Sequence, residues 1–174
     1  KTQLMYKKKK TKILILGGTG FIGYHLLKKC IRKGWDVTSI SKTYPNKNKF
    51  IRRVNYKNIN LENFKNFSIL EKNYDYIVNA SGYINNNDKL NYKDHNFKIV
   101  KNIFLYFKNT NIKAFVNIGT SAEYGGIKSL QNEKLICKPK SKYGKDKLKS
   151  TIFLINAFKK FKFPSIIFRT YQVY

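Results

Sequence analysis

A glycine-rich turn that joins an apolar run to a helical pattern is the feature that most constrains the fold of this chain. Residues 12–16 are apolar apart from the first, and glycines at 17, 20 and 23 follow them at every third position. A short run of this kind, bounded by glycines, is typical of a strand buried on both faces of a parallel sheet. A helical pattern continues to about residue 33, and Gly34 is placed to end that helix.

The spacing of these glycines gives each of them a separate task. The first permits a tight turn, the second lets a pyrophosphate approach the backbone, and the third lets the helix pack closely on the strand. The N-terminus of the helix adds unpaired N–H groups and a partial positive charge. We therefore predict that the turn holds a dinucleotide, through Gly17, Thr19, Gly20, Phe21, Ile22 and Gly23. The alternative is a glycine-rich turn without a ligand, which the flanking strand and helix disfavour.

Strand and helix patterns alternate through the rest of the chain. Strands are predicted at 12–16, 36–41, 52–56, 74–80, 113–119 and 165–169. Helices are predicted at about 21–33, 91–107 and 141–161, with a short one within 61–72. This alternation predicts an α/β fold, a doubly wound parallel sheet of strand order 3-2-1-4-5-6 with helices on both faces. Residues 1–11 are polar and basic and are expected to be a flexible lead-in, so that 12–174 forms one domain.

The formal net charge of +27 raises the question of a nucleic-acid role. Only four of the 36 cationic residues are arginines, and the lysines are spread along the chain. Lysine, asparagine and isoleucine are all in excess, which is typical of translation from an A/T-rich genome. Arginine is the better reader of bases and phosphates, so we expect no specific nucleic-acid partner. A basic surface would still attract anionic substrates.

The expected cellular setting follows from what the sequence contains. No apolar stretch approaches the ~20 residues that a membrane span needs, so we expect no membrane association. The two cysteines make no disulfide framework, which favours a reducing cytoplasm. Neither His25 nor His95 has a cysteine or acidic partner at metal spacing, so we expect no metal site and interpret His95 as incidental.

The end of the second strand bears on which dinucleotide binds. An acidic residue there would hold the 2′-hydroxyl of the adenine ribose and favour NAD. Ser41 and Lys42 stand at this place instead, and a hydroxyl beside a cation suits a 2′-phosphate. We expect NADP or NAD, with NADP slightly favoured. The alternative is that Lys42 is one more surface lysine.

Tyr143 and Lys147 form a Tyr-x-x-x-Lys pattern at the start of the helix predicted over 141–161. Side chains four residues apart share a helix face, so we expect Lys147 to lie beside Tyr143 and lower the pKa of its phenol. A phenol tuned in this way can exchange a proton with a substrate hydroxyl or carbonyl. Thr120 ends the fifth strand, at the sheet edge where parallel-sheet enzymes place their chemistry. Its hydroxyl can bind the reacting oxygen.

Together these motifs resemble the extended short-chain dehydrogenase/reductase superfamily, and within it the NAD(P)-dependent epimerase/dehydratase family of nucleotide-sugar enzymes. The resemblance covers about residues 11–174, with Thr120, Tyr143 and Lys147 in the places of the family's Ser/Thr-Tyr-Lys triad. It implies a Rossmann fold, a nucleotide-sugar substrate and a hydride transfer at a sugar carbon. It also implies cofactor contacts from residues that stand at family motifs, namely Asn60, Leu61, Ala80, Ser81, Gly82, Asn96 and Tyr171.

Two departures from the family pattern narrow the expected activity. Members that eliminate water usually carry an acid pair or a Glu directly after the catalytic Thr, whereas Ser121 and Ala122 stand here. Glu123 comes one position later and is expected to point elsewhere, which disfavours dehydration. The family also continues with a seventh strand and a C-terminal domain that binds the sugar nucleotide. We therefore expect this chain to be a fragment without its substrate-binding domain.

The resemblance thus leads to an enzyme in which Tyr143 is the acid/base, Lys147 orients the ribose and Thr120 holds the sugar oxygen. A 4-ketoreductase and a 4-epimerase both remain open. The alternative is a dinucleotide-binding sensor or scaffold without turnover, which the presence of both Tyr143 and Lys147 disfavours. In the family a helix pair that includes the one predicted at 91–107 often forms a dimer interface, which makes a homodimer a candidate assembly.

Overall fold

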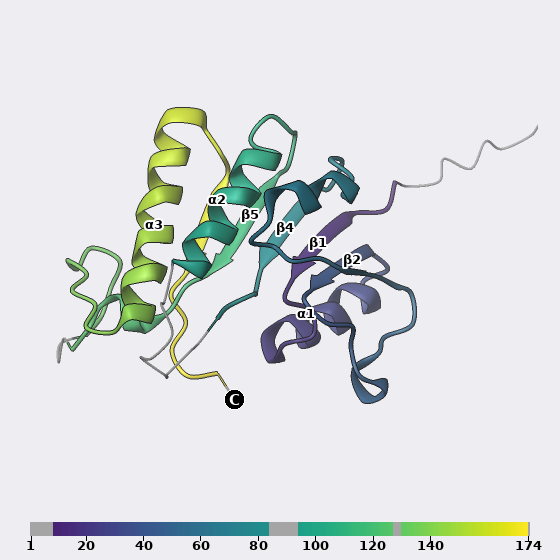
Figure 1. Cartoon of the computed structure of the whole chain (residues 1–174), viewed down its shortest axis with the longest axis horizontal. Helices are drawn as coiled ribbons and strands as arrows, with labels where there is room; N and C mark the ends of the chain where they lie inside the picture. The colour runs from purple at the N-terminus through teal and green to yellow at the C-terminus, as the bar shows by residue number, and fades with distance from the viewer. Residues whose placement is uncertain (1–8, 84–93, 127–129, 174) are drawn as a thin grey trace, which may run out of the picture.

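Six parallel strands form one sheet in the order β3-β2-β1-β4-β5-β6, which confirms the predicted fold class and strand order (Figure 1). The computed structural model describes residues 9–83, 94–126 and 130–173. Its strands are β1 (Lys12–Leu16), β2 (Asp36–Ser41), β3 (Val54–Asn58), β4 (Tyr76–Asn79), β5 (Ala114–Ile118) and β6 (Ser165–Phe168). Its helices are α1 (Phe21–Arg32), α2 (His95–Phe107) and α3 (Lys142–Phe161), with short 3₁₀ helices η1 (Lys47–Lys49), η2 (Phe64–Ile69) and η3 (Ser121–Glu123).

The central strand β1 is apolar along its length because helices cover both faces of the sheet. It pairs with β2 on one side and with β4 on the other. Leu14 and Leu16 belong to the core that α2 and α3 cover, whereas Ile13 and Ile15 belong to the core beside α1. Successive strand residues point to opposite faces, so a strand covered on both faces needs an unbroken apolar run.

The predicted element boundaries agree with the structure to within a few residues. The third strand, expected at 52–56, begins instead at Val54, because Arg53 has a φ of 77°, a left-handed conformation that a strand cannot contain. The short helix expected within 61–72 is η2, which Asn63 caps by accepting a hydrogen bond from the Lys65 N–H at 3.1 Å. Residues 1–8 of the predicted lead-in and 91–93 of the predicted helix lie outside the described residues.

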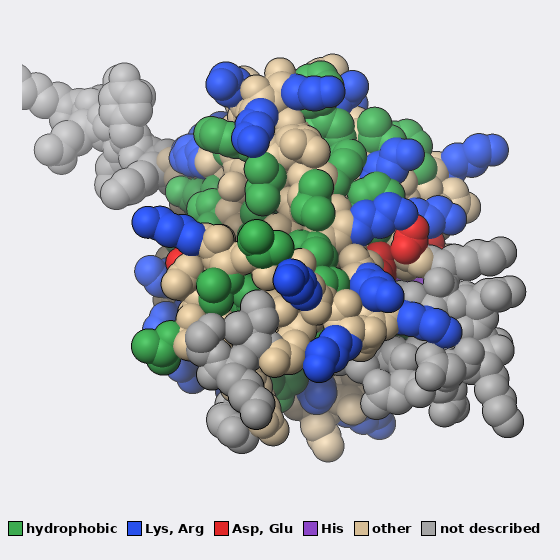
Figure 2. All heavy atoms as spheres, turned by 90° about the vertical axis from the view of Figure 1, so that its left-hand side faces the viewer, with side chains coloured by type: hydrophobic (Ala, Val, Ile, Leu, Met, Phe, Trp, Pro, Cys, Tyr) green, Lys and Arg blue, Asp and Glu red, His purple; other side chains and the backbone are tan. Residues whose placement is uncertain are grey.

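The outer face of α3 carries apolar side chains between lysines (Figure 2). Ile152, Ile155 and Phe158 of this helix are about half exposed, at 50%, 43% and 52%. Ile166 and Phe168 of the edge strand β6 are exposed to a similar degree, at 46% and 53%. Ile167 packs on the core that α2 and α3 cover, so Ile166 and Phe168 point to the opposite face of the sheet.

The N-terminus of α2 is capped by a carboxylate from another helix. Asp94 stands at the N-cap position, but its side chain makes no capping hydrogen bond. Asp146 of α3 instead accepts hydrogen bonds from the backbone N–H groups of Asn96 and Phe97, at 2.9 and 3.0 Å. It also accepts one from the Asn96 side-chain amide at 2.9 Å. The positive end of the helix dipole favours this carboxylate, which ties α2 to α3.

We predict that Asp146→Ala lowers the free energy of unfolding by roughly 1–3 kcal/mol, because it leaves buried donors of Asn96 and Phe97 without this acceptor. Asp94→Ala is the matched control, since the side-chain contact described for Asp94 is an exposed ion pair with Lys149 and such pairs contribute little. Urea unfolding followed by circular dichroism measures both variants. Equal losses for the two would show that Asp146 does not hold α2.

Candidate functional site

The glycine turn lies against the segment that follows β4, at positions where only glycine fits. Gly17 has a φ of +81°, and a Cβ on it would lie 2.7 Å from the backbone of Ser81. A Cβ on Gly23 would collide with the carbonyl oxygen of Gly17. A Cβ on Gly20, in contrast, would meet only one described atom within 4 Å beyond its chain neighbours, the Gly17 carbonyl oxygen at 3.3 Å. Gly17 and Gly23 thus serve close packing, while Gly20 faces open space.

The first turn of α1 presents hydrogen-bond donors to this open space. Gly20 is its N-cap, so no side chain caps the helix, and no acidic residue lies in the first turn. The first N–H groups of an α-helix have no partner within the helix, and the helix dipole adds partial positive charge there. A helix end of this kind suits the phosphates of a dinucleotide, so the residues present fit the predicted cofactor.

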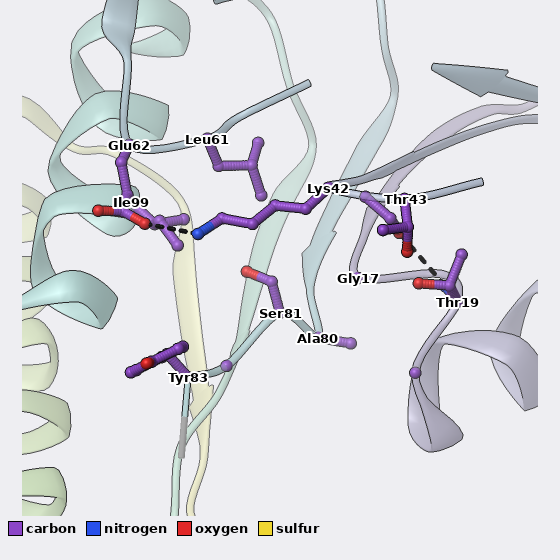
Figure 3. A pocket seen from close by; sticks show the side chains of 13 residues that line it. Gly17, Thr19, Lys42, Thr43, Leu61, Glu62, Ala80, Ser81, Tyr83 and Ile99 are labelled. Carbon is purple, nitrogen blue, oxygen red and sulfur yellow. Dashed lines mark hydrogen bonds and ion pairs between the residues drawn. The ribbon is translucent and has the colours of Figure 1, made fainter. Parts of the chain in front are cut away.

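A cavity of about 250 Å³ opens beside the turn, at the carboxyl ends of β1, β2 and β4 (Figure 3). Its lining consists of Gly17, Thr19, Gly20, Ser41, Lys42, Thr43, Leu61, Glu62, Ala80, Ser81, Gly82, Tyr83 and Ile99. Ser41 is joined to the turn, because its hydroxyl accepts a hydrogen bond from the Thr19 N–H at 3.3 Å. Leu61 and Ile99 supply apolar surface on which a flat base could pack.

Lys42 forms an ion pair within this cavity, with a partner that the sequence did not indicate. Its ammonium lies 2.8 Å from a carboxylate oxygen of Glu62, and the other Glu62 oxygen lies 2.6 Å from His95 Nδ1. Burial raises the pKa of the Glu62 carboxyl, but the hydrogen bonds with Lys42 and His95 outweigh burial and bring it below its usual value. His95, interpreted from the sequence as incidental, is therefore a contact of a cavity residue. No spacing pattern relates positions 42, 62 and 95, which come from three separate elements.

A second cavity, of about 380 Å³, adjoins the first along residues 80–82, which line both. It lies where β4, β5 and β6 end, and its lining consists of Phe21, Ile22, Ala80, Ser81, Gly82, Ile118, Gly119, Thr120, Tyr143, Lys147, Thr170, Tyr171 and Val173. The structure thus brings the three predicted catalytic residues, Thr120, Tyr143 and Lys147, into one cavity next to the glycine turn.

Asn79, the last residue of β4, fixes the segment that the two cavities share. Its side-chain oxygen accepts hydrogen bonds from the Ser81 N–H at 3.2 Å and from the Ser81 hydroxyl at 2.5 Å. Its side-chain amide donates to the Asn117 side-chain oxygen on β5 at 2.8 Å. The position of Ser81 is therefore set by the sheet itself.

Tyr143 is half-buried and lines the same cavity as Thr120, and the expected lowering of its pKa is wrong for this structure. Burial raises the pKa of the phenol above its usual value, and a hydrogen bond with the Thr120 side chain offsets only part of that effect. The negative charges of Glu123 and Asp146 raise it further. At neutral pH the phenol therefore keeps its proton and is placed to donate it.

Lys147 lines the same cavity as Tyr143, and its ammonium has a partner that the sequence did not indicate. It is 4% exposed, and its ammonium donates a hydrogen bond to the carbonyl oxygen of Ile118 at 2.5 Å. The four-residue spacing puts Lys147 on the Tyr143 face of α3, and its side chain reaches the last residue of β5. Burial lowers the pKa of this ammonium.

Glu123 points into the interior and joins the elements that surround the second cavity. The residue is fully buried. One carboxylate oxygen accepts a hydrogen bond from the Thr120 N–H at 3.1 Å. The other accepts from the Thr151 hydroxyl of α3 at 2.8 Å and from Arg169 Nε, just after β6, at 3.0 Å. One carboxylate thus holds the end of β5, α3 and the end of β6 together.

Three of the predicted cofactor residues lie outside both linings. Gly23 packs against Gly17, as described above. The Asn60 side chain accepts a hydrogen bond from the Glu62 N–H at 3.1 Å, and its predicted cofactor contact stays a prediction. Asn96 lies behind the cavity wall, where its side-chain oxygen accepts from the Tyr83 N–H at 3.0 Å. The others line one cavity or both: Gly17, Thr19, Gly20, Phe21, Ile22, Ser41, Lys42, Leu61, Ala80, Ser81, Gly82 and Tyr171.

Within residues 9–83, 94–126 and 130–173, no three His, Cys, Asp or Glu side chains gather as metal ligands would. None of the helices in this part of the chain combines the length and apolar character needed to cross a membrane.

The sheet order and the glycine turn define a Rossmann-type α/β domain. The chain belongs to the NAD dependent epimerase/dehydratase family, whose sequence profile matches residues 13–174. The resemblance inferred from the motifs is thereby confirmed.

Individual proteins extend this comparison. CDP-abequose synthase from Yersinia pseudotuberculosis is 32% identical over 116 residues, which are 65% of this chain and 41% of that protein. UDP-glucuronic acid 4-epimerase from Bacillus cereus, solved in complex with NAD, superposes with a TM-score of 0.80 at 22% identity over 94% of this chain. The UDP-Glc/GlcNAc 4-epimerase from Campylobacter jejuni superposes with a TM-score of 0.81 at 24% identity over 91% of this chain. The matches cover 57% and 53% of those two structures, so the chain spans about half their length.

We predict that Glu123→Ala lowers the free energy of unfolding by about 3 kcal/mol or more, because it leaves Arg169 and the Thr120 N–H without their carboxylate. Glu133→Ala is the matched control, since Glu133 is exposed in the loop that precedes α3. Thermal or urea unfolding measures both losses. A Glu123 variant as stable as the Glu133 variant would contradict the joining role of this carboxylate.

Proposed function

We propose that this chain is the cofactor-binding part of an enzyme that transfers a hydride at a sugar carbon of a nucleotide-linked hexose. The observation that carries this proposal is the junction of the two cavities along residues 80–82. One cavity adjoins the open N-terminus of α1, and the other contains Thr120, Tyr143 and Lys147. A dinucleotide laid along both would have its phosphates at α1 and its reactive ring beside Tyr143.

The residues that would hold NAD or NADP are those of the glycine turn and of the cavity walls. The N–H groups of Phe21 and Ile22 suit the pyrophosphate, Leu61 suits the adenine, and Tyr171 the nicotinamide side. When bound, the nicotinamide supplies a hydride acceptor or donor. Ser41 and Lys42 at the end of β2 still favour the 2′-phosphate form, so we propose NADP(H) as the slightly preferred cofactor.

The chain's own residues would manage the proton that accompanies the hydride. Tyr143 keeps its phenolic proton at neutral pH and can donate it to a sugar carbonyl oxygen, or accept one from a hydroxyl, at its own oxygen. Thr120, whose side chain lines the same cavity as that phenol, would hold the same sugar oxygen. The buried Lys147 ammonium is placed at the end of β5 to orient a ribose hydroxyl.

Both a 4-ketoreductase and a 4-epimerase fit this set of residues. Glu123, the carboxylate nearest in sequence to Thr120, already accepts three hydrogen bonds in the interior, which argues against elimination of water. A non-catalytic dinucleotide sensor is the alternative, and it gives no reason for Thr120, Tyr143 and Lys147 to line one cavity.

We further propose a cytoplasmic homodimer, with the α2 and α3 side as its interface. The exposed Ile152 and Phe158 supply apolar surface for it.

We predict that Tyr143→Phe in the full-length protein lowers turnover by about 10²–10⁴-fold while cofactor affinity stays nearly unchanged, because only the proton donor is lost. Lys147→Ala is expected to weaken both turnover and cofactor binding, and Thr120→Val to lower turnover less than Tyr143→Phe. The measurement is a turnover screen against keto- and hydroxy-sugar nucleotides.

Tyr44→Phe is the control for this series. It removes the same hydroxyl from a side chain that is 62% exposed and lines neither cavity, and it is expected to leave turnover unchanged. Unaltered turnover in Tyr143→Phe would contradict the assigned role of the phenol and favour a non-catalytic dinucleotide sensor.

A further inference from the structure

The cavity beside the glycine turn is crossed by one of its own side chains. Lys42 starts at the end of β2 and extends between Leu61 and Ser81 to Glu62 on the opposite side (Figure 3). Its ammonium lies 2.8 Å from Glu62 Oε1. The space in which an adenosine would lie is therefore spanned by the Lys42–Glu62 ion pair.

Glu62 is held in place from several directions. Its second carboxylate oxygen lies 2.6 Å from His95 Nδ1 at the start of α2. Its N–H donates to the Asn60 side chain at 3.1 Å, and its carbonyl oxygen accepts from the Asn102 side chain at 3.1 Å. The Glu62 side chain is 18% exposed, whereas that of Lys42 is 56% exposed. Lys42 is thus the movable member of the pair, and Glu62 is the fixed one.

We propose that Glu62 is a specificity-determining residue for the dinucleotide, because it holds Lys42 away from the end of β2 and places a negative charge in the adenosine part of the cavity. The inference rests on the proposed dinucleotide site. A 2′-phosphate would compete with Glu62 for the Lys42 ammonium, and the fixed carboxylate would repel that phosphate. A 2′-hydroxyl carries no charge, so its binding is little affected by the competition for Lys42 or by the repulsion from Glu62.

This arrangement would make the proposed preference of Ser41 and Lys42 for NADP a slight one. Either dinucleotide has to move the Lys42 side chain out of the cavity. Exposed ion pairs of this kind are weak, so the pair can open, but only the 2′-phosphate form offers the freed ammonium a new anionic partner. Removing the charge of Glu62 should therefore help both dinucleotides and help NADPH more.

The test is a fluorescence titration of the 174-residue chain with NADH and with NADPH, at one fixed low ionic strength. We expect the unmodified chain to bind NADPH a few-fold more tightly than NADH. Glu62→Gln is expected to widen that ratio by about tenfold, the size of one charge-assisted hydrogen bond. Lys42→Ala is expected to bring the ratio close to one, and Lys42→Ala combined with Glu62→Gln to behave like Lys42→Ala alone.

Glu71→Gln is the matched control. Glu71 pairs with Lys12 at the same 2.8 Å but lines neither cavity, so this variant removes the same charge from elsewhere on a chain of net charge +27. We expect it to leave the NADPH to NADH ratio unchanged. Circular dichroism of each variant confirms that it is folded before titration.

The outcomes separate the inference from the proposed function. If both dinucleotides bind but Glu62→Gln changes their ratio no more than Glu71→Gln does, the specificity role of Glu62 is overturned and the dinucleotide site stands. If the folded, unmodified chain binds neither NADH nor NADPH, the proposed site is overturned and this inference with it. A widened ratio in Glu62→Gln that Lys42→Ala abolishes supports the inference.

Discussion

The close approach of the turn after β1 to the backbone after β4 is the contact on which the rest of this structure depends. The Gly17 N–H donates to the Ile40 carbonyl of β2 at 2.7 Å, and the Ala80 N–H donates to the Leu16 carbonyl of β1 at 2.9 Å. These bonds extend the pairing of three strands beyond their ends, so that the strand termini form one edge. A side chain at position 17 would force this edge apart. Both cavities open along it, and residues 80–82 belong to each of them.

Much of the fold follows from local sequence, because strands covered on both faces need unbroken apolar runs and the turns between them need particular residues. Local sequence predicted the glycines at 17 and 23 and the apolar run of β1. It also predicted the Ser141 cap of α3, whose hydroxyl accepts a hydrogen bond from the Gly144 N–H at 3.0 Å. The error at β3 has a local cause as well. The positive φ at Arg53 concerns a single residue, and patterns of β-branched and apolar residues do not predict it.

The site was less predictable where its contacts cross between elements. Sequence position sufficed to bring Thr120, Tyr143 and Lys147 to one cavity, because the carboxyl ends of parallel strands share an edge. It could not supply the direction of long side chains. Lys147 shares a helix face with Tyr143 yet bonds to the Ile118 carbonyl, and Lys42 turns to Glu62, twenty residues away. The roles of Glu123 and Asp146 can be seen only in three dimensions, since the hydrogen bonds described for their carboxylates, apart from the one with Thr120, join residues far apart in the chain.

The carboxylate of Asp146 has a consequence for how this domain moves. It stands between Tyr143 and Lys147 in the sequence of α3, yet its hydrogen bonds go to the first turn of α2. Helix ends ordinarily fray before helix centres and exchange their amide hydrogens first. Here the start of α2 can open only when a buried carboxylate loses its donors, and that carboxylate belongs to the helix that carries the two cavity residues. We therefore expect the two helices to open as one cooperative unit, and a displacement of Tyr143 along the axis of α3 to reach the beginning of α2.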